Sequence, residues 1–227
     1  MQIFAGLKTP VKLLFFSQKN ACYPCTEQED LLAQLSNLSS KIVLEKYDFV
    51  LHGDQAMNYR IDKIPATAVV VNRDFGIRFY GLTTGYEFPS LVEAIKLVST
   101  GQTGLDPRLQ VLVQSIPQRI HLQVLAMLTC PHCPTMVQIA HKLAYLNPNI
   151  QSDMVELTSF PYLAQKYNIT GTPTTIVNET SQFVGALPAE ATYLEILRTV
   201  NPLQYQQIVQ QVQVIPPSQQ QFTTLNP

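Results

Sequence analysis

Two Cys-x-x-Cys pairs at a fixed offset constrain the fold of this chain more than any other sequence feature. Cys22 and Cys25 form the first pair, and Cys130 and Cys133 form the second pair 108 residues later. The same offset relates further identical residues, which are Tyr59 and Tyr167, Ile61 and Ile169, Pro65 and Pro173, Thr67 and Thr175, and Val69 and Val177. A chain of 227 residues can form two compact domains. The offset therefore indicates an internal duplication.

The same order of elements is predicted in each half of the chain: strand, helix, strand, short helix, two strands and a closing helix. Apolar runs at 11–16 and at 122–127 are typical of buried central strands. The segment after each run carries apolar residues at helical spacing, which indicates a helix with one face packed on a sheet. The expected fold class is α/β, with a mixed sheet flanked by helices in each half.

The predicted domains are residues 1–103 and 104–200, followed by a Gln-rich tail at 201–227. Asp106 and Pro107 form an N-cap and first-turn pair, so a helix of the second domain is expected to begin there. Apolar residues at helical spacing in the tail fit an amphipathic helix docked on the body. They fit a frayed end equally well.

Charge and hydropathy exclude several classes of partner. The net charge is −1 and no cluster of basic residues is present, so we expect the chain to bind neither nucleic acid nor an anionic membrane surface. The longest apolar runs fall far short of the roughly 18 residues that a membrane helix needs. The N-terminus lacks the pattern of a signal peptide, so a cytoplasmic location is expected. In a reducing compartment, close cysteine pairs are more often catalytic or metal-binding than structural.

The position of the cysteines predicts which sulfur reacts first. Cys22 and Cys130 are each expected after a strand and a loop, at the start of a helix. Free backbone N–H groups and the helix dipole favour a thiolate there, so these two are the predicted nucleophiles. Cys25 and Cys133, one helical turn further on, are predicted to resolve the mixed disulfide.

The residues between the cysteines predict that the two pairs differ. Tyr23 and Pro24 lie within the first pair, and Pro131 and His132 lie within the second. His132 can carry a positive charge beside both sulfurs and is expected to stabilise the thiolate. We therefore predict that the second pair is the more oxidising of the two.

One proline follows each predicted nucleophile by 43 residues and precedes an apolar strand. We expect the Ile64-Pro65 and Thr172-Pro173 bonds to be cis, which would turn the backbone of Ile64 and Thr172 toward the sulfur. The main chain there could bind an extended substrate segment. An ordinary proline at a strand edge is the simpler alternative.

The combination of a Cys-x-x-Cys at a helix start with a distant X-Pro-x-Thr before a strand resembles the thioredoxin and glutaredoxin superfamily. Residues 73–81 and 85–88 further resemble the protein disulfide oxidoreductase (glutaredoxin-like) family, over about residues 8–200. This resemblance implies two tandem thioredoxin-like folds and a thiol:disulfide oxidoreductase that reduces, forms or exchanges protein disulfides. It also implies that the C-terminal pair is the main site and that a thioredoxin-reductase-like flavoprotein supplies electrons.

A buried carboxylate lies six residues before the nucleophile in thioredoxins, but this chain has Phe16 and Val124 at those positions. Asp48 and Glu156 occupy equivalent strand ends and are the paired acids that could replace it. A solvated strand end is the simpler interpretation of both.

Two other interpretations of the cysteines remain open. The chain could be a redox relay or docking module for a peroxiredoxin or a flavoprotein reductase, with one pair vestigial. Four thiolates could also bind zinc, although two separate domains make this an unfavourable arrangement. No Gly-x-Gly-x-x-Gly motif follows a strand, so no bound cofactor or metal is expected. Electrons are expected from another protein or a small thiol.

Overall fold

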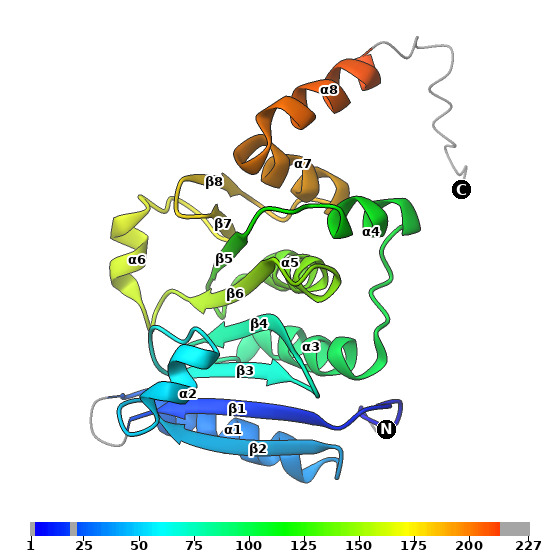
Figure 1. Ribbon diagram of the computed structural model, residues 1–227. Coiled ribbons are helices and arrows are strands. Elements are labelled where there is room, and N and C mark those ends of the chain that lie inside the picture. The colour runs from blue at the N-terminus through cyan, green and yellow to red at the C-terminus, as the bar shows by residue number, and fades with distance from the viewer. Residues whose placement is uncertain (1–2, 19–21, 214–227) are drawn as a thin grey trace, which may run out of the picture.

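The computed structural model describes residues 3–18 and 22–213 (Figure 1). The strands are β1 (Val11–Ser17), β2 (Ile42–Asp48), β3 (Ala66–Val70), β4 (Asp74–Tyr80), β5 (Ile120–Ala126), β6 (Ile150–Glu156), β7 (Thr174–Val177) and β8 (Ser181–Val184). The helices are α1 (Cys25–Asn37), α2 (Gly53–Asn58), the 3-10 helix η1 (Gly85–Glu87), α3 (Phe88–Thr100), α4 (Pro107–Gln114), α5 (Cys133–Leu146), α6 (Pro161–Lys166), α7 (Ala189–Val200) and α8 (Pro202–Gln213). The predicted α/β fold class is confirmed.

All eight strands belong to one sheet, in the order β2-β1-β3-β4-β6-β5-β7-β8. Each half contributes four neighbouring strands, and the halves join where β4 pairs in parallel with β6. The pairings make β1, β4, β5 and β6 all parallel to one another. The carboxyl ends of β1 and β5 therefore lie on the same side of the molecule. The loops that follow these two strands lead to the two cysteine pairs.

Close approach of the two halves depends on a glycine. Gly76 lies in β4 with φ +73°, and a Cβ there would lie 2.8 Å from the carbonyl oxygen of Ile150 at the start of β6. Only glycine combines this backbone conformation with such a short approach.

Gly76→Ala is accordingly expected to destabilise the fold by about 2–4 kcal/mol, since it adds left-handed backbone strain to a clash with backbone. Chemical denaturation followed by circular dichroism measures this. Gly53→Ala is the control, because a Cβ at Gly53 meets no atom within 4 Å. Equal stability of the two variants would contradict the proposed role of Gly76.

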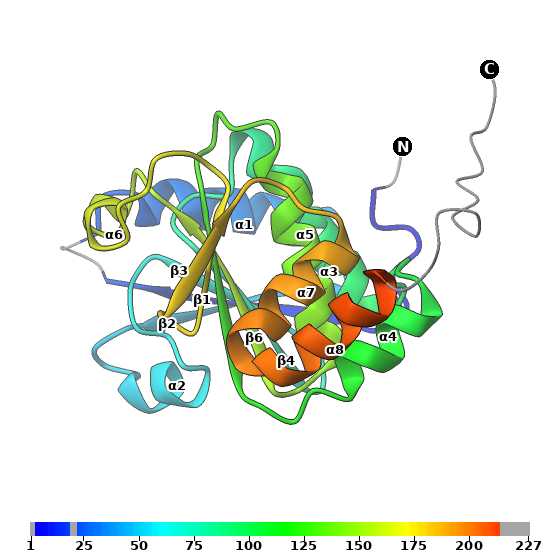
Figure 2. The ribbon, with the colours of Figure 1, turned by 90° about the horizontal axis from the view of Figure 1, so that it is seen from above.

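Two hydrophobic cores lie on opposite faces of the sheet, because successive strand residues point to opposite sides. Leu13 and Phe15 of β1 belong to one core, and Leu14 and Phe16 belong to the other. Helices α1, α3, α5 and α7 cover the first core, while α2 and α6 cover the second. In the view of Figure 2, α2 and α6 lie to the left, away from α3, α5 and α7.

The predicted tail contains a helix, α8, which contacts α7. Tyr205 and Ile208 of α8 pack against the first core, so the amphipathic-helix alternative holds for residues 202–213. Residues 214–227 lie outside the described part of the chain. The domain boundaries at 103 and 200 stay predictions. None of the helices within residues 3–18 and 22–213 is long and apolar enough to cross a membrane.

Candidate active site

Both cysteine pairs are disulfides. The Cα atoms of Cys22 and Cys25 are 5.4 Å apart, and those of Cys130 and Cys133 are 5.5 Å apart. Helices α1 and α5 begin at the second cysteine of each pair, whereas the sequence indicated a start at the first. The first cysteine lies in the turn before the helix, where its sulfur can face the free N–H groups of the first helical turn.

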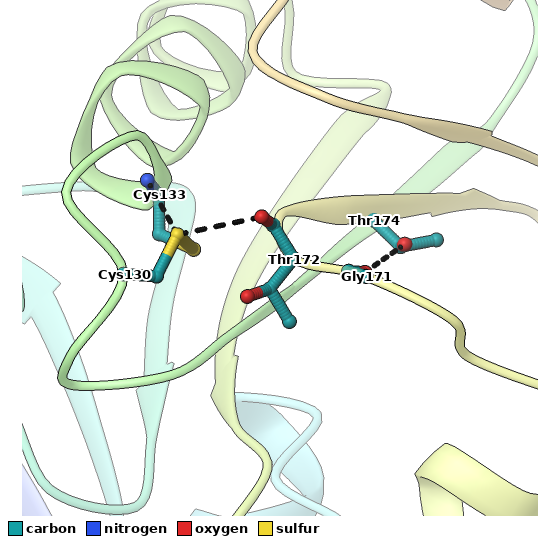
Figure 3. Close-up of a disulfide and its surroundings, with 5 residues drawn as sticks. All are labelled: Cys130, Cys133, Gly171, Thr172 and Thr174. Carbon is teal, nitrogen blue, oxygen red and sulfur yellow. Dashed lines mark hydrogen bonds between the residues drawn. A yellow bond between two sulfur atoms is a disulfide. The ribbon is translucent and has the colours of Figure 1, made fainter.

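The sulfur of Cys130 has two close polar neighbours (Figure 3). The backbone N–H of Cys133 donates a hydrogen bond to it over 3.1 Å, and the carbonyl oxygen of Thr172 lies 3.5 Å away. Cys130 is 8% exposed and Cys133 is fully buried. In the reduced protein, the N–H donor would stabilise a Cys130 thiolate, while the carbonyl could accept a hydrogen bond from a neutral thiol.

The first pair has a different environment. Cys25 is buried, Cys22 is half-buried and Tyr23 is fully exposed. The backbone N–H of Cys25 donates to the carbonyl oxygen of Cys22, over 3.3 Å. Among the hydrogen bonds of the described residues, none reaches the sulfur of Cys22. The two pairs are therefore not equivalent in hydrogen bonding.

The Ile64-Pro65 and Thr172-Pro173 bonds are both cis, which confirms that prediction. The carbonyl oxygens of Pro65 and Pro173 accept equivalent hydrogen bonds from the N–H of the glycine at the end of the following hairpin. Thr172 lies beside Cys130, whereas Ile64 packs against the second core. Substrate binding by Ile64, Pro65, Thr172 and Pro173 stays a prediction.

His132 is exposed at the N-cap position of α5. Its placement between the two cysteines allows the thiolate stabilisation expected from the sequence, which stays a prediction. Separate reduction potentials of the two pairs would test it, and a more reducing second pair would contradict it.

The two acids offered as substitutes for the thioredoxin carboxylate cap the turns that follow their strands. Glu156 is buried and accepts hydrogen bonds from the N–H groups of Thr158 and Ser159 and from the Ser159 hydroxyl. Asp48 accepts hydrogen bonds from two backbone N–H groups in the same way. The interpretation of Glu156 as a solvated strand end was wrong, because the turn folds its backbone donors over the carboxylate.

The structure identifies an acid that sequence reasoning missed. Glu87 is fully buried in η1, and neither carboxyl oxygen has a hydrogen-bond partner among the described residues. Burial raises the pKa of Glu87 to about 7, and the nearby Ser90 hydroxyl opposes this shift only in part. Helix η1 belongs to the first half of the chain but packs against α5 of the second half. No local sequence pattern marks Glu87, because the packing of η1 against α5 joins segments far apart in the sequence.

Comparisons with known proteins agree with this geometry. The model of the thioredoxin domain family matches residues 120–198. The NTD_N/C domain of alkylhydroperoxide reductase AhpF from Enterococcus faecalis superposes with a TM-score of 0.81 at 26% identity, covering 86% of this chain and 94% of that chain. A protein disulfide oxidoreductase from Aeropyrum pernix gives a TM-score of 0.80 at 26% identity, covering 86% of this chain and 87% of that chain. This chain is a tandem thioredoxin-fold thiol:disulfide oxidoreductase.

Curated relatives of this oxidoreductase are longer proteins. A Bacillus subtilis protein named NADH dehydrogenase is 31% identical over 166 residues, which cover 71% of this chain and 30% of the relative. An alkyl hydroperoxide reductase component from Xanthomonas campestris pv. phaseoli is 32% identical over 152 residues, which cover 67% of this chain and 27% of the relative. The oxidoreductase thus spans less than a third of the length of these relatives.

Proposed function

We propose that Cys130 and Cys133 form the principal exchange site of this oxidoreductase. The observation that carries the proposal is the short contact between the Cys133 N–H and the Cys130 sulfur, with the Thr172 carbonyl on the other side. The N–H group stabilises a Cys130 thiolate, which is the form that attacks a disulfide. The hydrogen bonds of the first pair supply no such donor to Cys22 among the described residues, so that pair is the secondary site.

The exchange proceeds in two balanced steps. The Cys130 thiolate attacks one sulfur of a substrate disulfide, forming a mixed disulfide and releasing the other substrate sulfur as a thiolate. Cys133 then loses its proton and attacks the Cys130 sulfur, which releases the second substrate thiolate. The substrate gains two electrons, and the cysteine pair ends as the disulfide seen here. The reverse sequence forms a substrate disulfide.

The substrate segment is proposed to run past Thr172 and Pro173 in an extended conformation. Ile64 and Pro65 are proposed to bind a substrate segment in the same way at the first pair. A groove of about 370 Å³ ends at Thr172 and is lined by Met127, Leu157, Pro161 and Ile169, among others. Most of this lining is apolar, and Met127 is 42% exposed. The groove supports a substrate with an apolar side chain close to its disulfide.

Glu87 is proposed to take the proton that Cys133 loses before it attacks. A carboxyl group is useful in this role at neutral pH only when its pKa lies near 7, because it must be able to both gain and release a proton. Burial raises the pKa of Glu87 to about 7, because the nearby Ser90 hydroxyl offsets the loss of hydration only in part. Helix η1 packs against α5, and the N–H of Tyr86 donates to the carbonyl oxygen of Leu128, two residues before Cys130. The segment that carries Glu87 is thus in contact with the turn that leads to the second pair, which supports the proposed role.

A redox relay is the second candidate function, favoured by the relatives named as alkyl hydroperoxide reductase components. In this role the chain would carry electrons from a flavoprotein reductase to a peroxiredoxin. As a general oxidoreductase, it would act on many protein disulfides and take electrons from a thioredoxin-reductase-like flavoprotein or a small thiol. A reducing compartment, the cytoplasm, suits both roles.

Trapping with Cys133→Ser tests the site and separates the two roles. Without the resolving sulfur, the mixed disulfide on Cys130 should accumulate in cells and be recovered with its partner. Many partners would indicate a general oxidoreductase, and one peroxide-reducing partner would indicate a relay. Cys25→Ser is the matched control and should capture far less. Equal or greater capture on Cys22 would overturn the assignment of the principal site.

A further inference from the structure

A buried glutamine follows the first cysteine pair by one helical turn. Gln28 lies on α1, three residues after Cys25, and is fully buried. The residue that the 108-residue offset places at the same position of α5 is Met136, also fully buried. An apolar side chain therefore suits this position of the fold. A buried amide costs free energy unless it is hydrogen-bonded, so its presence in one half only needs a physical reason.

Both ends of the Gln28 amide bind Thr83. The Nε2 group donates to the Thr83 hydroxyl oxygen over 2.9 Å, and the backbone N–H of Thr83 donates to Oε1 over 2.9 Å. Thr83 is fully buried as well. A two-point bond of this kind between buried groups holds its loop in one position, since breaking it leaves several polar groups unpaired.

The loop that starts at Thr83 reaches the second cysteine pair. The backbone N–H of Tyr86 donates to the carbonyl oxygen of Leu128 over 3.0 Å. Gly85 has φ +58°, and a Cβ there would lie 2.7 Å from the same oxygen. Leu128 belongs to the turn in which the N–H of Cys130 donates to the carbonyl oxygen of Met127, over 2.9 Å.

We propose that Gln28 and Thr83 are positioning residues for the second cysteine pair, acting across the junction between the halves. They hold the loop 83–87 of the first half against the turn 127–130, and this turn sets where the Cys130 sulfur lies. The role rests on the proposed function of Cys130 as the attacking sulfur. It also explains why glutamine and not methionine occupies this position in α1, because the loop 83–87 of the first half contacts the turn that leads to the second cysteine pair.

The test measures alkylation of Cys130 by iodoacetamide in the reduced 227-residue chain at pH 7, read by peptide mass spectrometry separately from the other cysteines. Gln28→Met places the residue of the second half at this position and removes the hydrogen bonds to Thr83, including the weaker one from the Thr83 hydroxyl to Oε1 over 3.2 Å. It is expected to slow alkylation of Cys130 about fivefold. This factor corresponds to the net free energy of about one hydrogen bond, which would no longer hold the turn in place. Thr83→Val, which keeps the N–H donor, should have a smaller effect. Thr83→Ser, which keeps all of these hydrogen bonds, should match the wild type.

Gln110→Met is the control, because the side chain of Gln110 on α4 donates a single hydrogen bond to the carbonyl oxygen of Leu105, just before this helix. It should leave the rate at Cys130 unchanged. Wild-type rates in folded Gln28→Met and Thr83→Val would overturn the positioning role, even if both variants melt at lower temperature. If Gln28→Met does not fold, the alkylation rates of Cys130 in Thr83→Val and Thr83→Ser are compared instead. Equal rates in these two variants would overturn the positioning role. A wild-type chain in which Cys133 reacts before Cys130 would instead overturn the proposed function.

Discussion

Cys130→Ser should reduce the turnover of a protein disulfide by at least about 100-fold, because serine cannot form the attacking thiolate at neutral pH. The backbone donor of Cys133 and the Thr172 carbonyl would remain in place, so binding geometry is largely preserved while the nucleophile is lost. Insulin-disulfide reduction with dithiothreitol as the electron source measures this directly. The variant should retain the thermal stability of the reduced wild-type protein.

Cys22→Ser is the matched control for this prediction. It removes the equivalent sulfur of the first pair and should leave most of the turnover intact. If Cys22→Ser is the more damaging change, the first pair is the principal site. If the intact protein itself gives no turnover above the dithiothreitol background, the relay role gains support over general disulfide reduction, since insulin would then be a poor substrate for either pair.

Glu87→Gln should slow exchange by about 100-fold at pH 7, the size of effect expected when a general acid–base group is lost. In the wild type, the rate should rise as the carboxyl group ionises near pH 7, because the ionised form accepts the proton from Cys133. Glutamine cannot accept that proton, so this rise should be absent from the pH profile of the variant.

The same substitution should stabilise the fold at neutral pH. Burial raises the pKa of Glu87 from 4.5 to about 7, so the folded state holds the proton more tightly than the unfolded state. The wild type therefore loses stability as pH rises from about 4.5 to about 7, by about 2–3 kcal/mol relative to Glu87→Gln. Chemical denaturation at pH 4 and pH 8 measures the difference, which should vanish at the lower pH.

Glu93→Gln is the control for both measurements, because Glu93 is an exposed residue of α3 that pairs with Lys96. It should alter neither the pH profile nor the stability difference between pH 4 and pH 8. A Glu87→Gln variant with full activity would overturn the role in proton transfer. Unchanged activity together with raised stability at pH 8 would show that Glu87 is buried without taking part in the exchange.

Features that depend on short stretches of sequence were predictable here. Apolar runs and apolar residues at helical spacing predicted the element order and the α/β class, and the prolines 43 residues after the first cysteines predicted the cis bonds. The start of each helix was predicted less well, because Cys22 and Cys130 lie in a turn whose length their spacing does not specify. Glu156 was misinterpreted for a similar reason, since burial of its carboxylate depends on how the next turn folds back.

The repeated fold and the two cysteine pairs followed from the sequence alone, because the spacing of cysteines, prolines and apolar residues is repeated along the chain. The contacts between the two halves could be seen in the three-dimensional structure alone. Pairing of β4 with β6, permitted by Gly76, brings η1 of the first half onto α5 of the second. Glu87 is buried in η1, and the hydrogen bonds of Thr83 and Tyr86 connect Gln28 to the turn before Cys130. Such contacts join residues far apart in sequence, and no periodic pattern encodes which strands of the two halves will meet.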